Sequence, residues 1–227
     1  MAYDLFLFDL DDTLLDFRAS ERLSFFSTMQ SLGVTASVND LFELYQVENR
    51  LLWKLFEEAK TTKEHLKVER FRKVFAAHQI EIDPAVASNR YLDALPEAVV
   101  LIDGAVEVCE WLSKRGEIGI VTNGIHKVQT RRIGNSAIAP YISFMSVSEE
   151  AGFAKPDVRF FEYSAKMAKK FDKASTVVIG DRLETDILGA NSFGIDSCWF
   201  NPSGHPSTLE FKPKFEIQRL IELKSIL

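Results

Sequence analysis

Five short, mostly apolar runs recur along this chain, and stretches that can form helices separate them. The runs span residues 3–8, 118–121, 141–147, 176–179 and 195–200. Such runs are typical of strands that are buried on both faces of a parallel sheet. Parallel strands need crossover connections, and helices predicted between the runs, such as residues 157–170 and 185–193, supply them. The alternation therefore predicts an α/β domain built on a parallel sheet.

The segment between the first two runs has a different character. Residues 17–95 contain almost no strand signal, and apolar residues recur there at helical spacing, most clearly over residues 40–60. Thr62 and the pair Asp83-Pro84 are predicted helix starts. We therefore expect an all-helical cap domain inserted into the α/β core. The expected boundaries are 17–95 for the cap and 1–16 with 96–227 for the core.

Composition and charge exclude several classes of function. A chain with 46% hydrophobic and 26% charged residues is an ordinary globular protein, neither disordered nor fibrous. Its net charge of −6 gives no basic face for a nucleic-acid polymer, because attraction to phosphates supplies most of that affinity. No uncharged apolar run approaches the roughly 18 residues of a membrane span, and acidic residues near the N-terminus interrupt any signal peptide. We expect a cytoplasmic monomer or homodimer, with Cys109 and Cys198 as buried, reduced thiols.

Three acidic residues follow the first apolar run directly, in the sequence Phe8-Asp9-Leu10-Asp11-Asp12-Thr13. Their mutual repulsion has to be offset by a cation. Asp9 and Asp11 lie on the same side of an extended chain, so both can face one centre. Mg²⁺ suits them because it takes one or two carboxylates and leaves its other positions to water and phosphate. The alternative is a helix cap or a turn, which Asp and Thr also favour.

Polar residues also follow later runs, each just past a predicted strand. Thr122 and Asn123 offer a hydroxyl and an amide that can meet an anion, although they are also ordinary turn residues. Lys155 can neutralise a phosphate oxygen or hold a carboxylate, with a solvent-exposed lysine as the alternative. Asp181 can complete a metal shell, and Asp186 can orient Lys155 or a metal-bound water. Ligand sites of open α/β sheets lie at the carboxyl ends of the strands, so these residues are predicted to meet.

This set of residues resembles the motifs of the haloacid dehalogenase superfamily of aspartate-nucleophile hydrolases. The matching residues are Asp9-x-Asp11-x-Thr13, Thr122, Lys155 and Gly180-Asp181-x-x-x-x-Asp186. The resemblance covers essentially the whole chain, and it implies a Rossmann-like core, dependence on Mg²⁺ and, usually, hydrolysis of phosphate monoesters.

The resemblance also implies a role for each matched residue. Asp9 would be the nucleophile and a metal ligand, and Asp11 the general acid/base with its main-chain carbonyl on the metal. Lys155 and Thr122 would bind the transferring phosphoryl group, and Asp181 would bind Mg²⁺. The chemistry adds the main-chain N–H of Asn123 as a further donor to phosphoryl oxygens.

A finer resemblance is to the house-cleaning pyrimidine 5′-nucleotidases. It is carried by Asp16-Phe17, Leu52-Trp53, Phe56-Glu57, Thr122-Asn123-Gly124, Ser148-Glu149, Lys155-Pro156 and the segment 214–217. It implies nucleoside 5′-monophosphates as substrates, and a cap that excludes water and contacts the leaving group. Asn49 and Trp53 are the predicted substrate contacts in the cap, with a buried structural tryptophan as the alternative for Trp53.

Several alternative functions remain open at this point. They are a phosphatase of another small metabolite (a sugar phosphate or phosphoglycolate), a phosphomutase, a 2-haloacid dehalogenase and a non-catalytic binding module. A dehalogenase would share Asp9 but needs neither a metal nor an acid at Asp11. A binding module predicts the loss of at least one residue of the catalytic set, and none is lost.

Overall fold

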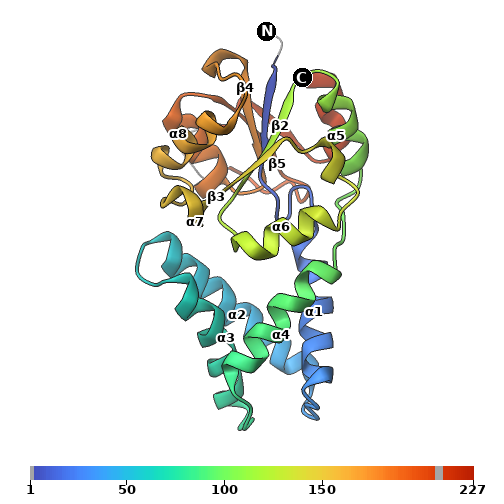
Figure 1. Cartoon of the computed structure of the whole chain (residues 1–227), viewed down its shortest axis with the longest axis vertical. Helices are drawn as coiled ribbons and strands as arrows, with labels where there is room; N and C mark the ends of the chain where they lie inside the picture. Colours follow the sequence, from blue (N-terminus) through green and yellow to red (C-terminus); the bar gives the residue numbers. More distant parts are fainter. Residues whose placement is uncertain (1–2, 208–211) are drawn as a thin grey trace. The chain divides into compact units, whose positions relative to one another are not determined.

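The computed structural model describes residues 3–207 and 212–227, and these form two compact units (Figure 1). The core unit comprises Met1–Phe17 and Val100–Leu227, and the helical unit comprises Arg18–Val99. The boundaries fall after residues 17 and 99, where the sequence predicted them after residues 16 and 95. Each unit is described by itself below.

A parallel sheet forms the centre of the core unit, which confirms the predicted α/β fold. In the described part of the chain it has six strands: β1 Leu5–Phe8, β2 Glu117–Thr122, β3 Phe144–Val147, β4 Thr176–Gly180, β5 Asp196–Phe200 and β6 Phe215–Ile217. The strand order is β3-β2-β1-β4-β5-β6, and every neighbouring pair is parallel. The order reverses at β1, and doubly wound sheets bind ligands outside the carboxyl ends of the strands at such a point.

Helices lie between the strands of the core unit: α5 Ala105–Ser113, α6 His126–Gly134, α7 Ser148–Ala151, α8 Val158–Met167 and α9 Leu188–Phe193. A further helix, α10 Leu223–Ile226, follows β6. The third strand is shorter than the predicted run 141–147, because residues 139–141 around Pro140 form a 3₁₀ turn. The predicted helix 185–193 begins as a π-helical turn over Leu183–Ile187.

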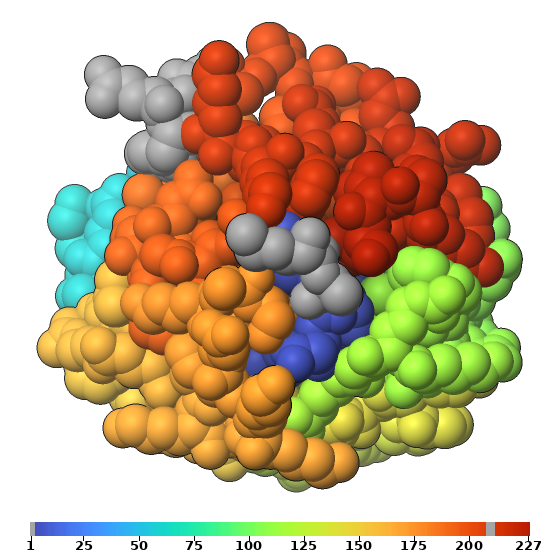
Figure 2. All heavy atoms as spheres, turned by 90° about the horizontal axis from the view of Figure 1, so that it is seen from above, coloured from blue at the N-terminus to red at the C-terminus, as the bar shows by residue number. Residues whose placement is uncertain are grey.

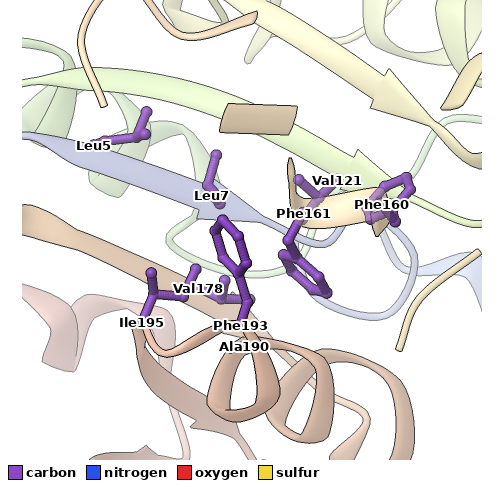
Figure 3. Packing of buried hydrophobic residues seen from close by; sticks show 9 residues of the cluster. All are labelled: Leu5, Leu7, Val121, Phe160, Phe161, Val178, Ala190, Phe193 and Ile195. Atoms are coloured by element: carbon purple, nitrogen blue, oxygen red, sulfur yellow. The ribbon is translucent and has the colours of Figure 1, made fainter. Parts of the chain in front are cut away.

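Alternate residues of β1 pack on opposite faces of the sheet. Leu5 and Leu7, exposed by 1% and 0%, pack in a cluster with Phe160 and Phe161 of α8 and with Phe193 of α9 (Figure 3). Burial of each leucine contributes about 2 kcal/mol to folding. Such a strand has no solvent-facing side, which is why it reads as a continuous apolar run in the sequence.

The start of β1 is fixed in the middle of the core by main-chain hydrogen bonds. Asp4 N–H donates to Ser175 O at 3.0 Å, and Glu117 N–H donates to Asp4 O at 2.8 Å. Figure 2 accordingly shows the start of β1 (blue) bordered by the green segment that precedes β2, the orange segment that precedes β4 and red segments near the C-terminus. At the other end of the strand, Asp9 N–H donates to Ile179 O of β4 at 2.8 Å.

The helical unit contains α1 Phe17–Ser31, α2 Val38–Glu57, α3 Lys63–Ala77 and α4 Pro84–Ala94, and the first residue of α1 is the last of the core unit's N-terminal segment. The two predicted helix starts are confirmed: Thr62 accepts a hydrogen bond from His65 N–H, and Asp83 accepts one from Ala85 N–H. Aromatic rings form its core, namely Phe25, Phe42, Tyr45, Phe71 and Tyr91. Among the described residues, no helix combines the length and apolar character needed to cross a membrane.

Candidate active site

The three acidic residues of the loop after β1 have different contacts. Asp12 adopts a left-handed φ of 58°, which Asp tolerates better than most residues. Its N–H donates to Leu15 O at 2.7 Å, and its carboxylate accepts from Phe17 N–H at 2.9 Å, at the start of α1. The capping and turn interpretation of the acidic cluster therefore holds for Asp12. Asp9 instead contacts Lys155, in the loop that follows α7, and Asp11 contacts residues of α6.

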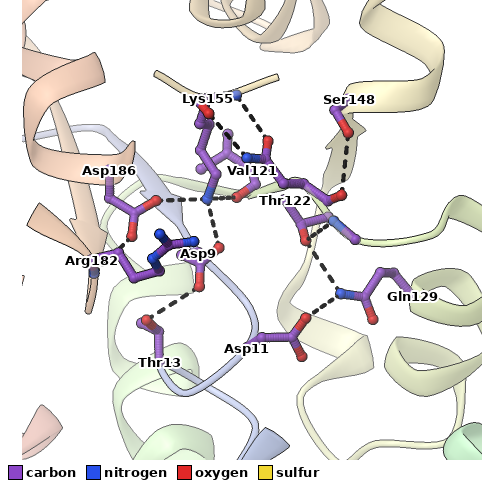
Figure 4. Close-up of polar contacts among 12 residues, drawn as sticks. Asp9, Asp11, Thr13, Val121, Thr122, Gln129, Ser148, Lys155, Arg182 and Asp186 are labelled. Carbon is purple, nitrogen blue, oxygen red and sulfur yellow. Dashed lines mark hydrogen bonds and ion pairs between the residues drawn. The ribbon is translucent and has the colours of Figure 1, made fainter. Parts of the chain in front are cut away.

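Lys155 joins Asp9 and Asp186 at the centre of the site (Figure 4). Its Nζ donates to Asp9 Oδ1 at 2.6 Å, to Asp186 Oδ1 at 2.6 Å and to Val121 O at 2.7 Å. These acceptors use all three ammonium protons, and Lys155 is only 2% exposed. Burial lowers the pKa of Lys155, but the charges and hydrogen bonds of Asp186 and Asp9 outweigh it and raise the pKa overall. A permanent positive charge thus lies against the expected nucleophile.

Asn123 positions this lysine through its main chain. The Asn123 side chain donates to Lys155 O at 3.0 Å and accepts from Lys155 N–H at 2.8 Å. The side-chain amide is therefore used within the protein, so the expected phosphoryl contact of Asn123 is assigned to its main-chain N–H. Thr122, 2% exposed, accepts from Gly124 N–H at 3.0 Å through its hydroxyl oxygen. The hydroxyl proton of Thr122 remains available to an anion.

Asp186 needs a glycine at position 180. A Cβ at Gly180 would collide with the Asp186 carboxylate, so glycine at the end of β4 lets that carboxylate approach the strand. Asp186 Oδ2 also accepts from Arg182 N–H at 3.1 Å. Both oxygens of Asp186 are therefore bonded, one of them to Lys155, and the expected role of Asp186 in orienting that lysine stays a prediction.

A cluster of three carboxylates indicates a cation site. Carboxylate oxygens of Asp9, Asp181 and Asp186 all lie within 4.8 Å of one another. Asp181 Oδ1 is buried and accepts no hydrogen bond from any described residue. An orphaned anionic oxygen beside another carboxylate fits a hard divalent cation such as Mg²⁺. Both oxygens of Asp186 accept hydrogen bonds, from Lys155 and from Arg182 N–H, so Asp9 and Asp181 are the carboxylates that would hold the ion. The main-chain carbonyl of Asp11 stays a predicted ligand.

Burial, and after it the neighbouring negative charges, raise the pKa values of Asp9 and Asp181. Burial raises the pKa of Asp9 to about 7, with Lys155 opposing the shift and Asp186 and Asp11 adding to it. Burial also raises the pKa of Asp181, to about 9, and the charges of Asp9 and Asp186 increase it further. A bound divalent cation would reverse both shifts, because it favours the charged carboxylates.

The sequence did not identify two residues that contact Asp11. Gln129 Nε2 donates to Asp11 Oδ2 at 2.6 Å, and Arg132 Nη1 pairs with Asp11 Oδ1. Both lie on α6, three residues apart and therefore on one face of the helix. That spacing directly after the Thr122-Asn123-Gly124 turn is the signal that could have identified them.

The two predicted cap residues lie in the helical unit. Asn49 is 5% exposed; its side chain donates to Glu21 Oε1 at 2.8 Å and accepts from Arg70 Nη1 at 3.0 Å. Trp53 is half-buried and packs edge to face with Phe56, with ring centroids 5.7 Å apart. Substrate contact by either residue stays a prediction, and Asn49 has a clear structural role within its own unit.

The geometry of the core unit agrees with a family match. A protein-family model described as haloacid dehalogenase-like hydrolase matches residues 3–194. The chain belongs to the haloacid dehalogenase-like hydrolase family. The match extends from β1 to the end of α9 and includes Asp9, Lys155 and Asp181.

Individual relatives within this family include two named nucleotidases. The chain is 36% identical over 225 residues to the HAD-hydrolase YfnB of Bacillus subtilis, covering 99% of this chain and 95% of YfnB. The crystal structure of YfnB, bound to magnesium, matches with a TM-score of 0.92 over 100% of this chain and 99% of that one. Pyrimidine 5′-nucleotidase PynA of Streptococcus pneumoniae is 34% identical, covering 96% of this chain and 92% of PynA. Pyrimidine 5′-nucleotidase YjjG of Escherichia coli is 29% identical, covering 100% of this chain and 99% of YjjG.

Proposed function

We propose that this hydrolase is a Mg²⁺-dependent phosphatase that acts on nucleoside 5′-monophosphates, pyrimidine nucleotides first. The observation that carries the phosphatase proposal is the pairing of Asp9 with Lys155, next to the orphaned carboxylate of Asp181. The choice of substrate rests on the named relatives PynA and YjjG. The magnesium in the crystal structure of YfnB supports the choice of metal.

The proposed reaction has two steps, both at phosphorus. An Asp9 carboxylate oxygen attacks the phosphorus atom, the bond to the leaving oxygen breaks, and Asp11 gives its proton to that oxygen. Asp11 then takes a proton from water, whose oxygen attacks the aspartyl-phosphate, releasing inorganic phosphate and restoring Asp9. The Thr122 hydroxyl and the Asn123 N–H hold the equatorial oxygens, where charge spreads in the transition state, and Lys155 supplies positive charge beside them while its protons bond Asp9, Asp186 and Val121 O. Mg²⁺, when bound, supplies positive charge that offsets the repulsion between Asp9 and the phosphate dianion.

A dehalogenase would leave two features of this site without a role. Displacement of a halide needs no general acid, whereas Asp11 is held next to Thr122 by a shared partner, Gln129. It also needs no metal. In this site the carboxyl groups of Asp9 and Asp181 lie close together and have raised pKa values, an arrangement that a bound cation would stabilise. Phosphate ester hydrolysis gives both features a function.

A substrate panel tests the proposal. kcat/KM is measured for UMP, dUMP and dTMP against purine monophosphates, a sugar phosphate and phosphoglycolate, with Mg²⁺ and with excess EDTA. We expect the pyrimidine nucleotides to be preferred and activity to disappear in EDTA. A tenfold preference for a sugar phosphate or phosphoglycolate, about 1.4 kcal/mol of transition-state stabilisation, would refute the nucleotidase proposal and leave the phosphatase proposal standing. Full activity in EDTA would refute the metal dependence.

A further inference from the structure

Two buried residues behind Asp11 have no role in the reaction described above. Gln129 and Arg132 are 2% and 0% exposed, whereas the side chain of Asp11 is 30% exposed. Each of the two bonds a different oxygen of the Asp11 carboxylate. The Asp11 carboxylate is thus partly exposed to solvent and is bonded to two buried side chains.

Gln129 also connects Asp11 to the expected phosphate site. Its Nε2 lies 2.6 Å from Asp11 Oδ2 and 3.2 Å from Thr122 Oγ1 (Figure 4). Its Oε1 accepts from Arg132 Nη1 at 2.9 Å. Both ends of the amide are therefore bonded, which fixes its orientation. Through this one side chain, the position of Asp11 is tied to that of Thr122.

The backbone leaves room for this arrangement at Gly124. A Cβ at this position would collide with the side-chain amide of Gln129. Glycine after Thr122-Asn123 therefore allows Gln129 to lie against the turn, where it reaches both Thr122 and Asp11. This is a requirement of close approach, independent of the hydrogen bonds themselves.

A purely structural role does not account for Arg132. Its Nε and Nη2 atoms are buried and bond no described residue. Burial of a guanidinium costs more than its pairing returns unless its hydrogen bonds are satisfied, and an apolar side chain would stabilise this position better. Arg132 Nη1 bonds Gln129 Oε1, and the guanidinium lies 5.4 Å from the centre of the Phe17 ring, but its one ion pair among the described residues is with Asp11, and Gln129 in turn bonds Asp11. Its contacts therefore converge on the Asp11 carboxylate.

We propose that Gln129 and Arg132 are positioning residues that hold the Asp11 carboxylate beside Thr122, where it meets the leaving-group oxygen of a phosphate bound at Thr122. This inference rests on the proposed phosphatase function. It assigns the two residues a role in proton delivery and no contact with the substrate. Their removal should therefore matter most when the leaving group needs a proton.

The test compares leaving groups in single-turnover phosphorylation of Asp9. UMP leaves as a basic alkoxide and needs protonation, whereas p-nitrophenyl phosphate leaves as a stable phenolate. For Gln129→Leu and Arg132→Met we expect at least about a tenfold loss of phosphorylation rate with UMP, and less than about threefold with p-nitrophenyl phosphate. KM should change by less than about threefold. Lys127→Met is the matched control, because Lys127 is an exposed cation on the same helix.

A double-mutant cycle separates positioning from stability. In an Asp11→Asn background, Gln129→Leu should add less than about a twofold loss, since its partner no longer carries the proton. If Arg132→Met fails to fold, which its melting temperature will show, Gly124→Ala replaces it. This variant displaces Gln129 without removing a polar group, and it should also slow phosphorylation more with UMP than with p-nitrophenyl phosphate.

The outcomes distinguish this inference from the function beneath it. Equal losses with both substrates, or a full additional loss in the Asp11→Asn background, would overturn the positioning role and leave the phosphatase intact. A wild-type protein that turns over neither substrate with Mg²⁺ would overturn the proposed function, and the inference with it.

Discussion

Asp9 is the nucleophile of the proposed reaction. Asp9→Asn should reduce turnover below about 1% of wild type, which corresponds to more than about 2.7 kcal/mol in barrier height. Burial raises the pKa of Asp9, so removal of its charge should leave the apoprotein as stable as before, while Lys155 keeps its bond to Asp186. Turnover and the melting temperature without metal are the measurements. Activity clearly above this level would exclude Asp9 as the nucleophile.

Asp181 takes part in no step of the proposed reaction, and one of its oxygens bonds no described residue. A variant at this position therefore tests metal binding. Asp181→Asn should raise the melting temperature of the apoprotein, because burial and the neighbouring carboxylates disfavour its charge. It should also abolish the stabilisation that saturating Mg²⁺ gives the wild type, about 3 kcal/mol at a hundred times Kd. Glu184→Gln, at an exposed carboxylate three residues away, is the control. A variant that Mg²⁺ still stabilises fully would show that the ion binds elsewhere.

The raised pKa values of Asp9 and Asp181 also predict how pH affects metal binding. Above the ordinary carboxyl pKa of 3.8, the folded apoprotein keeps protons that the unfolded chain has lost, so its stability falls as pH rises towards about 7 for Asp9 and about 9 for Asp181. Mg²⁺ has to displace these protons. Its affinity should therefore increase by up to about tenfold per pH unit between pH 6 and 8 for each proton displaced. Calorimetric titration at several pH values measures it, and a constant Kd would contradict the expectation.

At the scale of elements, the helices of the cap are held by a polar cluster inside an aromatic core. Asn49 on α2 joins Glu21 of α1 to Arg70 of α3. Asn49→Ala should destabilise the protein by about 1–3 kcal/mol, because it leaves two buried charged partners short of a hydrogen bond. Asn39→Ala, at an exposed amide on the same helix, should change stability by less than about 0.5 kcal/mol. Denaturant unfolding measures both. An unchanged stability with a raised KM for UMP would instead make Asn49 a substrate contact.

For the whole molecule, we expect the two units to have different functions, with catalysis in the core unit and substrate selection in the helical unit. The residues assigned to the reaction lie in the core unit, while Trp53 lies in the helical unit. If the cap contacts the leaving group, Trp53→Ala should raise KM for UMP by about tenfold or less, the value of one aromatic contact, and leave p-nitrophenyl phosphate nearly unaffected. Phe26→Ala provides a control at another partly buried ring of the same unit. Equal effects on the two substrates would indicate a packing role for Trp53.

The sequence by itself determined the parallel sheet, five of its six described strands and the place of the site. A strand buried on both faces must be apolar throughout, so the strands could be recognised from local pattern alone. Parallel strands bring their carboxyl ends together at one edge of the sheet. The positions of Asp9, Thr122 and Asp181 at the ends of separate runs therefore predict that these residues lie close together. Helix starts at Thr62 and Asp83 were equally local, because a cap bonds an N–H only two or three residues away.

Only the tertiary structure decided which side chains bond to one another across the chain. Gln129 and Arg132 reach Asp11 over 118 and 121 residues of sequence. Their spacing after the turn places them on one face of a helix, but it does not specify Asp11 as their partner. Asn123 gives its amide to the main chain of Lys155, 32 residues away, where the turn alone suggested a direct contact with phosphate. A hydrogen bond needs a partner within about 3 Å, and the chain's packing in three dimensions sets that distance for residues so far apart in sequence.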